Sequence, residues 1–216
     1  MQVSLYKISG KLAWILFAVL AISISLYPLY YLLADGVVGL LNTKDPNLLQ
    51  KFSWKTGFYT HIIFGGIALM IGWMQFSKKL RKDRIKLHRR LGKLYVISVY
   101  LSSLAGIYIG YHATGGIIAM LGFMLLGLFW FSFTLKAYLD IRKGDINSHE
   151  RMMIYSYALC FAAVMLRLWM GPLVALMGDF IPAYRIVAWL CWLPNLGVAY
   201  WINTKLEKKK KTILSV

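Results

Sequence analysis

The fold is decided by a stretch that reads GFYTHIIFGGIALMIGWMQF (57–76), SKKLRKDRIKLHRR (77–90) and LGKLYVISVYLSSLAGIYIGY (91–111). Each apolar segment is about 20 residues long, the length that a helix needs to cross a bilayer. The loop between them holds eight Lys and Arg residues against one Asp. Positively charged loops beside membrane spans stay in the cytoplasm. This loop therefore predicts the orientation of both helices and, by alternation, of every other span.

Composition places the whole chain in the membrane class. It has 216 residues, of which 59% are hydrophobic and 15% charged, and its mean hydropathy is +0.60. Soluble domains carry about 25% charged residues. The net charge of +17 lies in loops and ends beside apolar runs, and no separate basic domain exists. This pattern excludes a nucleic-acid-binding protein and predicts contact with the anionic cytoplasmic leaflet of the lipid bilayer.

Further apolar runs extend the pattern to an all-α integral membrane protein, a single domain that is a bundle of six transmembrane helices. Lys and Arg concentrate at both ends of the chain and in the loops that alternation places inside, so both termini are predicted to be cytoplasmic. Residues 203–216 are predicted to form a basic cytoplasmic tail, and the location is predicted to be a bacterial inner (plasma) membrane. The predicted spans are residues 12–33, 57–76, 91–111, 117–139, 151–173 and 184–202.

Local sequence signals predict where individual helices bend and begin. Pro28 lies in the outer part of the first span and is expected to kink it, because proline lacks an amide N–H. Asp45 followed by Pro46 is a favourable helix start and predicts a short helix on the membrane surface. Asn147 or Ser148 is expected to cap the fifth span.

Two spans carry a stripe of small and polar residues that is expected to face the interior of the bundle. Residues three and four apart share one face of a helix, and lipid is a poor neighbour for His, Gln or Arg side chains. Small residues allow either a close neighbouring helix or a flat bound group. The second span presents His61, Gly65, Ala68, Gly72 and Gln75. The fifth span presents His149, Ser156, Cys160, Ala163 and Arg167.

The polar residues near the spans limit the chemistry. No predicted span contains Asp or Glu, which disfavours a carboxylate proton relay, and no phosphate-binding, zinc-protease or serine-hydrolase motif is present. Cys160 and Cys191 are expected to be buried free thiols. By the predicted topology the histidines divide into two pairs. The outer pair is His61 and His112, and the inner pair is His88 and His149.

Each histidine pair comes from two different helices, as the two axial ligands of a b-type haem require. A structural explanation stays open for each candidate. His61 can be satisfied by a hydrogen bond to a neighbouring helix, and His88 and His149 can be ordinary interface residues. Arg167 is the one charge well inside a span. It either points into the bundle as a ligand contact or snorkels outward, toward Asp179.

Two separated motifs resemble an uncharacterised bacterial family of predicted membrane proteins, a domain of unknown function. They are HRRLGKLY (88–95) and HERMM (149–153), the second followed by YSYA (155–158) and Arg167. The helix plan of that family resembles that of membrane b-type cytochromes with two haems, including the ascorbate-reducible group. The resemblance implies His61, His88 and His149 as haem ligands. The fourth span has no histidine, so only His112 could complete the set.

Three functions remain open at this point. The first is electron transfer through haem b (heme b), with a quinol or small reductant as partner, the inner pair His88 and His149 as ligands, and Gly92 leaving space beside them. The second is non-redox binding of a lipid, an anion or a transported solute, with Arg167 as the anion contact. The third is a zinc-dependent membrane hydrolase. Its outer residues would be His61, His112, Asp35 and Asp179.

Overall fold

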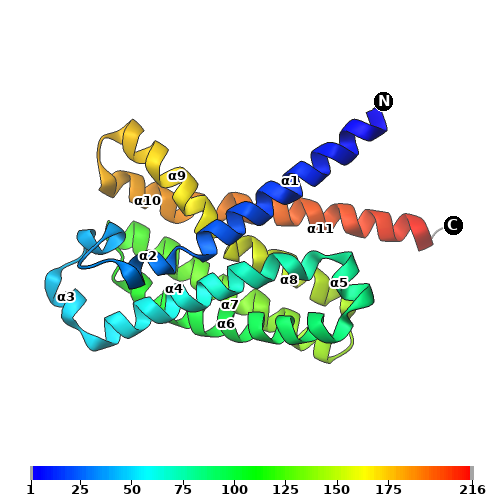
Figure 1. Cartoon of the computed structure of the whole chain (residues 1–216), viewed down its shortest axis with the longest axis horizontal. Helices are drawn as coiled ribbons and strands as arrows, with labels where there is room; N and C mark the ends of the chain where they lie inside the picture. The colour runs from blue at the N-terminus through cyan, green and yellow to red at the C-terminus, as the bar shows by residue number, and fades with distance from the viewer. Residues whose placement is uncertain (1, 215–216) are drawn as a thin grey trace.

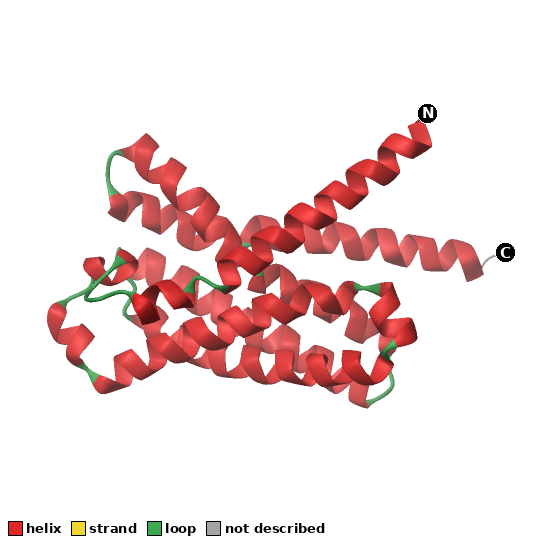
Figure 2. Cartoon of the chain, viewed as in Figure 1, coloured by secondary structure: helices red, strands yellow, loops and turns green. Residues whose placement is uncertain are grey.

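The computed structural model describes residues 2–214, and within them the chain is helical apart from short turns and loops (Figure 2). Among the described residues, six segments are long and apolar enough to cross a membrane, which confirms the predicted all-α bundle. Apolar side chains such as Ile97, Leu104 and Leu168 are exposed on their outer faces, as contact with lipid requires. The six segments are Lys11–Leu33, Phe52–Phe76, Ile85–Tyr111, Ile117–Arg142, Ile146–Met177 and Phe180–Thr212.

The helices extend further than the apolar runs that predict them. The described elements, including two 3-10 turns, are α1 (Gln2–Ser25), α2 (Pro28–Leu33), η1 (Gly39–Thr43), α3 (Pro46–Gln50), α4 (Phe52–Gly72), η2 (Trp73–Phe76), α5 (Lys78–Asp83), α6 (Ile85–Tyr111), α7 (Ile117–Arg142), α8 (Ile146–Cys160), α9 (Ala162–Met177), α10 (Phe180–Leu190) and α11 (Leu193–Leu214).

The predicted basic loop at 77–90 is mostly helical, which corrects the expectation from the sequence. Ser77 caps α5, because its hydroxyl accepts a hydrogen bond from the amide of Leu80 at 3.3 Å. Lys, Arg and Leu are good helix formers, and α6 begins as early as Ile85. His88 therefore lies in the first turn of a helix and not in a loop.

Acidic side chains outside the apolar runs set the starts of two more helices. Asp145 caps α8 by accepting a hydrogen bond from the amide of Ser148 at 2.9 Å, so the predicted caps at Asn147 or Ser148 are wrong. Asp179 caps α10 in the same way. The predicted basic tail continues α11 as a helix to Leu214. Its last two residues lie outside the described part of the chain.

Within the described residues, three of the six spans consist of two consecutive α-helices. The first is interrupted between Ser25 and Pro28, which confirms the predicted kink at the proline. The fifth bends at Phe161, between α8 and α9, and the sixth is interrupted before α11, whose second residue is Pro194. The short helix predicted after Asp45 is also present as α3, capped by the Asp45 carboxylate.

The helices α4, α6, α7 and α8 pack side by side in series, with α1 against α4, α11 against α8, and the α9–α10 hairpin against α7. Figure 1 shows the described ends of α1 and α11 pointing to the same end of the molecule as α5, while α3 lies at the opposite end. We call the α5 end the inner half and the α3 end the outer half. Which half faces the cytoplasm stays a prediction.

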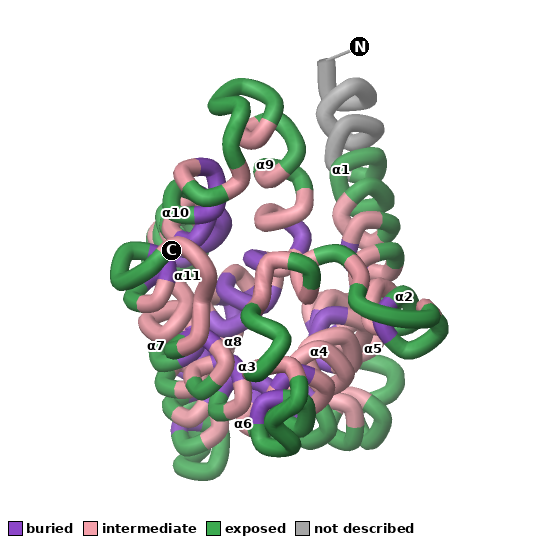
Figure 3. Tube along the Cα trace, turned by 90° about the vertical axis from the view of Figure 1, so that its left-hand side faces the viewer, coloured by how far each residue is buried: buried purple, intermediate pink, exposed green. Residues whose placement is uncertain are grey.

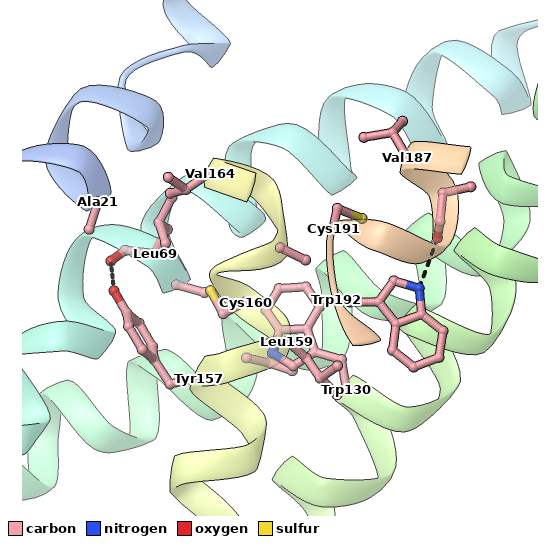
Figure 4. Close-up of a cluster of buried hydrophobic side chains, with 14 of the residues drawn as sticks. Ala21, Leu69, Trp130, Tyr157, Leu159, Cys160, Val164, Val187, Cys191 and Trp192 are labelled. Carbon is pink, nitrogen blue, oxygen red and sulfur yellow. Dashed lines mark hydrogen bonds between the residues drawn. The ribbon is translucent and has the colours of Figure 1, made fainter. Parts of the chain in front are cut away.

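The buried segments gather where the helices face one another (Figure 3), and in the inner half buried hydroxyl groups bond to one another across helices. The Tyr95 hydroxyl lies 2.8 Å from the Ser156 hydroxyl, which lies 2.6 Å from the Thr134 hydroxyl. Thr134 donates its proton to a carbonyl of its own helix, so Ser156 donates to Thr134 and Tyr95 donates to Ser156. The Tyr157 hydroxyl donates to the Leu69 carbonyl at 3.0 Å (Figure 4). This network joins α4, α6, α7 and α8.

The stripe predicted on the second span faces the bundle, as expected. Ala68, Gly72 and Gln75 are buried. A Cβ atom at Gly72 would lie 2.3 Å from the Tyr157 ring, and one at Gly65 would lie 3.1 Å from the Ser102 hydroxyl. The small residues therefore allow close packing against α6 and α8.

Candidate functional site

The outer half contains a partly open cavity of about 620 Å³, a size in the range typical of small-molecule sites. Helices α2, α4, α6, α9 and α10 contribute to its wall, which is mainly aromatic, aliphatic and glycine residues. Side chains that carry a hydroxyl, ring nitrogen or charge interrupt this apolar wall at a few places. They are Tyr27, Tyr31, Lys44, Trp54, His61, Ser103, Trp130, Arg167 and Tyr184.

His61 reaches the cavity from the middle of α4 and is oriented by α6. Its Nδ1 lies 2.9 Å from the Ser102 carbonyl oxygen. A carbonyl can only accept, so Nδ1 carries the proton. Close approach is possible because the facing residue is Gly106, where a Cβ atom would lie 2.8 Å from Nδ1. The hydrogen bond to a neighbouring helix considered from the sequence is present, and it leaves the Nε2 lone pair available.

Arg167 projects from α9 into the same cavity. Its Nη1 donates to the Ala163 carbonyl at 2.7 Å, and its Cζ lies 4.2 Å from the centroid of the Tyr27 ring. The buried Nε has no hydrogen-bond partner, and no carboxylate of residues 2–214 forms an ion pair with the guanidinium. Asp179, the partner considered from the sequence, caps α10 instead.

These two residues belong to one polar cluster. Arg167 lies close enough to His61 and Tyr31 to interact with both electrostatically. The Tyr31 hydroxyl accepts a hydrogen bond from the amide of Leu40 at 3.3 Å, which joins α2 to the connection that covers the outer end. Three separate helices thus bring a hydrogen-bond acceptor, a cation and a hydroxyl to one wall of an otherwise apolar cavity.

Lys44 closes the cavity from the connection between α2 and α3. Its Nζ donates to the His112 carbonyl at 2.5 Å, and the Thr43 and Thr114 hydroxyls lie 3.1 Å apart beside it. Burial lowers the pKa of Lys44 to about 8. Lys44 is therefore a second cation of the cavity, charged at neutral pH.

His112 is not part of the cavity wall. It follows the last residue of α6, and its ring packs edge-on against Tyr108 and Tyr111. Desolvation lowers its pKa, and the charges of Lys51 and Lys44 lower it further. The predicted outer pair is thus not brought together in the cavity, which contains His61 alone.

The inner pair does come together, and the buried Nδ1 of His88 has no hydrogen-bond partner among the described residues. His88 and His149 lie close enough to interact electrostatically. Nδ1 of His149 lies 2.8 Å from the Ala137 carbonyl and therefore carries the proton. Beside Gly92, where the sequence predicts space, a Cβ atom would meet Gln75 Oε1 at 3.6 Å, an ordinary contact distance. Neither inner histidine lines the outer cavity.

The prediction of a zinc hydrolase finds no site in the described part of the chain. A zinc ion needs three or four ligands that converge on one point. Among residues 2–214, no three His, Cys, Asp or Glu side chains are grouped so that they could hold a metal ion. Cys160 and Cys191 are buried free thiols, as predicted.

Several residues of the site could not be recognised from the sequence. Tyr27 and Tyr31 were not singled out, although they flank the kink at Pro28 that turns them inward. Lys44 lies in a connection, where no periodic pattern exists. Ser102 is one of several small polar residues on α6, and nothing in its spacing identifies it as the partner of His61.

A family model described as "Predicted membrane protein (DUF2306)" matches residues 58–202, more than half of the chain. The matched region includes His61 and Arg167 and excludes Lys44. No curated protein and no solved structure is detectably similar to the chain.

Proposed function

The chain belongs to this family of predicted membrane proteins, and we propose that it binds an amphipathic anion in its outer cavity, with Arg167 as the contact for the charged group. The unpaired guanidinium is the observation that carries the proposal. The bound molecule would be a lipid-like acid, with its apolar part along the aromatic and aliphatic wall. The protein is then a multi-pass binding or transport protein of the membrane.

Energetics favour a counter-ion beside Arg167. An uncompensated charge inside a protein costs several kcal/mol, and a cation–π contact such as that with Tyr27 returns only about 0.5–2 kcal/mol. The hydrogen bond to the Ala163 carbonyl satisfies one nitrogen, and Nε has no partner. A bound carboxylate or phosphate would accept from the free N–H groups in the forked geometry that arginine prefers.

The test is calorimetric titration of the purified protein, in a non-ionic detergent, with decanoate. Decanol, which has the same chain and no charge, is the matched probe. We expect saturable binding of decanoate, more than tenfold tighter than that of decanol, because tenfold is only about 1.4 kcal/mol and a charge pair in an apolar cavity is worth more.

Variants locate the site. Arg167→Gln is expected to weaken decanoate binding more than about tenfold, whereas Arg167→Lys keeps the charge and loses less. Arg185→Gln is the matched control, because Arg185 is an exposed arginine of α10 whose Nε donates to the Gly115 carbonyl and which does not line the cavity. Equal affinity of the Arg167→Gln variant and the wild type would contradict the proposal.

Haem b is the second candidate ligand, and the tautomer of His61 favours it. A histidine that donates Nδ1–H to a carbonyl presents Nε2 as a metal ligand. Arg167 and Lys44 are suited to hold the two propionates, and the mainly apolar wall suits the body of a macrocycle. Bound haem would supply one-electron transfer, to which a quinol or small reductant could be the donor.

A visible spectrum separates the two candidates. If haem is the ligand, the purified or haem-loaded protein shows a Soret band that shifts on reduction, and His61→Ala removes it. Under that hypothesis His112→Ala and His149→Ala retain the band. A protein that stays colourless after loading with haem, yet binds decanoate, contradicts the haem hypothesis and leaves the anion site.

A further inference from the structure

We infer that the cavity takes up its anion together with one proton, which His61 accepts on Nε2. The inference rests on the proposed function, because it concerns the same cavity and needs an anion at Arg167. The inference narrows the ligand class to acids whose anion binds together with one proton. His61 is then the residue that couples binding to pH.

The geometry around His61 fixes which nitrogen can change its protonation. Nδ1–H is committed to the Ser102 carbonyl at 2.9 Å. The Ser102 hydroxyl donates to the His61 carbonyl at 2.9 Å, so α4 and α6 hold each other in register at this point. Nε2 has no described hydrogen-bond partner, and the residue lines the cavity. Nε2 is therefore the position at which a proton can be gained.

Charge explains why the proton arrives with the anion. In the empty cavity Arg167 supplies one positive charge close to His61, and a second one would be repelled in apolar surroundings. An anion at Arg167 cancels that charge and offers a second oxygen to a donor. A protonated Nε2–H can then donate to the anion, which gives it two cationic partners.

The step balances without another reactant. If the ligand enters as the anion, a proton from the solvent forms the Nε2–H bond. If it enters as the neutral acid, its O–H bond breaks, the Nε2–H bond forms, and the electron pair of the O–H bond stays on the anion. In both cases the bound anion has two cationic partners, Arg167 and protonated His61, in addition to the charge of Lys44 at the cavity wall.

Other titratable groups face the cavity from the surrounding elements and must be separated from His61. At pH 7 tyrosine hydroxyls and cysteine thiols are protonated in solution, so they do not gain a proton. Lys44 is the exception that needs a control, because its pKa is about 8. The titratable residues of the cavity wall, apart from His61 and Arg167, are Tyr27, Tyr31, Lys44, Cys160, Tyr184 and Cys191.

Proton uptake is measured by titrating decanoate into the wild-type protein at about pH 7 in buffers that differ in ionisation enthalpy. The dependence of the observed heat on the buffer gives the number of protons bound per ligand. We expect about one proton for the wild type and for Lys44→Met, because the proton that His61 accepts on binding the anion comes from the buffer. His61→Asn is expected to bind decanoate without proton uptake, because its amide N–H can still donate to Ser102 but cannot be protonated.

A second measurement does not depend on a variant that folds. In wild-type protein labelled with nitrogen-15 histidine, one of the four histidines should change from the neutral Nδ1–H tautomer to imidazolium when decanoate is added. Decanoate binding with no proton uptake and no change in any histidine overturns the inference but leaves the proposed function intact. Uptake that persists in His61→Asn and is lost in Lys44→Met also overturns it. Failure of the wild type to bind decanoate overturns both.

Discussion

The two halves of the helix bundle contain the same kinds of residues but differ in how their buried polar side chains are packed. In the inner half, Tyr95, Ser156 and Thr134 use their hydroxyls on one another, and the Tyr157 hydroxyl is bonded to the Leu69 carbonyl. In the outer half the same helices, together with α2, α9 and α10, leave a cavity of about 620 Å³ around Arg167.

The difference teaches which polar residues indicate a ligand. A buried hydroxyl or histidine that finds a protein partner contributes to packing and needs nothing more. His149 and the Tyr95–Ser156–Thr134 chain belong to this group. Buried polar atoms without a partner occur in both halves, for example in Gln75 and His88 of the inner half. Arg167 and the Nε2 atom of His61 differ from these because they line the cavity, and for this reason the proposal places the ligand in the outer half.

The largest expected effect comes from testing which half faces the cytoplasm, because a topology reporter is either active or silent. A reporter that is active only in the cytoplasm should be active when inserted after Arg84, in the basic inner region. The same reporter inserted at Asn47, in the outer connection, should be silent. Activity at Asn47 and silence after Arg84 would exchange the two halves and place the cavity in the cytoplasmic leaflet.

Packing in the two halves is compared by adding one methyl group to each. A Cβ atom at Gly72 would lie 2.3 Å from the Tyr157 ring, whereas one at Gly110, which lines the cavity, would make only ordinary contacts at 3.4 Å or more. Gly72→Ala should therefore destabilise the protein by about 1–3 kcal/mol. Gly110→Ala should be neutral or slightly stabilising. Thermal denaturation in detergent checks both, and equal melting temperatures would show that the inner half is not tightly packed.

The outer half should also respond to pH through Lys44. Its pKa of about 8 in the folded state is below the ordinary lysine value. Between about pH 8 and pH 10.4 the unfolded chain therefore binds more protons than the folded one. Because of this difference, the Lys44 contribution to the free energy of unfolding rises with pH in this window. The melting temperature of the wild type should rise relative to Lys44→Met, and a constant difference between the two proteins would contradict the buried position of Lys44.

The smallest effect is expected at the inner surface, where Glu150 joins α5, α8 and α11. Its carboxylate pairs with Arg81 at 2.7 Å and with Lys210 at 3.2 Å, and all three side chains are partly exposed. Each exposed pair contributes about 0.2–1 kcal/mol. Glu150→Gln should lower the melting temperature slightly at low salt and not at high salt. A large loss at both salt concentrations would mean that these contacts hold the bundle together.

The sequence predicted the fold better than the site, for physical reasons. The length of an apolar run must match the thickness of the bilayer that the helix crosses, so all six spans could be predicted from the sequence. Helix ends were misplaced because polar caps such as Ser77 and Asp145, outside the apolar runs, decide them. Helical spacing placed His61 and Arg167 on inward faces. It could not show that Ser102 would hold His61, since the partner depends on the rotation of α6.

The difference between filled and hollow halves was not predictable from one chain, because it depends on which side chains meet across helices. His112 shows this limit. It has the right position along the sequence for the outer pair, yet it packs against tyrosines of its own helix end.

Crystals grown with ω-bromodecanoate test the central claim most directly, because the anomalous signal of bromine locates the ligand independently of the protein. We predict a bromine position inside the outer cavity and a carboxylate oxygen about 2.7–2.9 Å from a nitrogen of Arg167. Bromine found only at the basic inner end or on the lipid-facing surface, with nothing beside Arg167, would contradict the account.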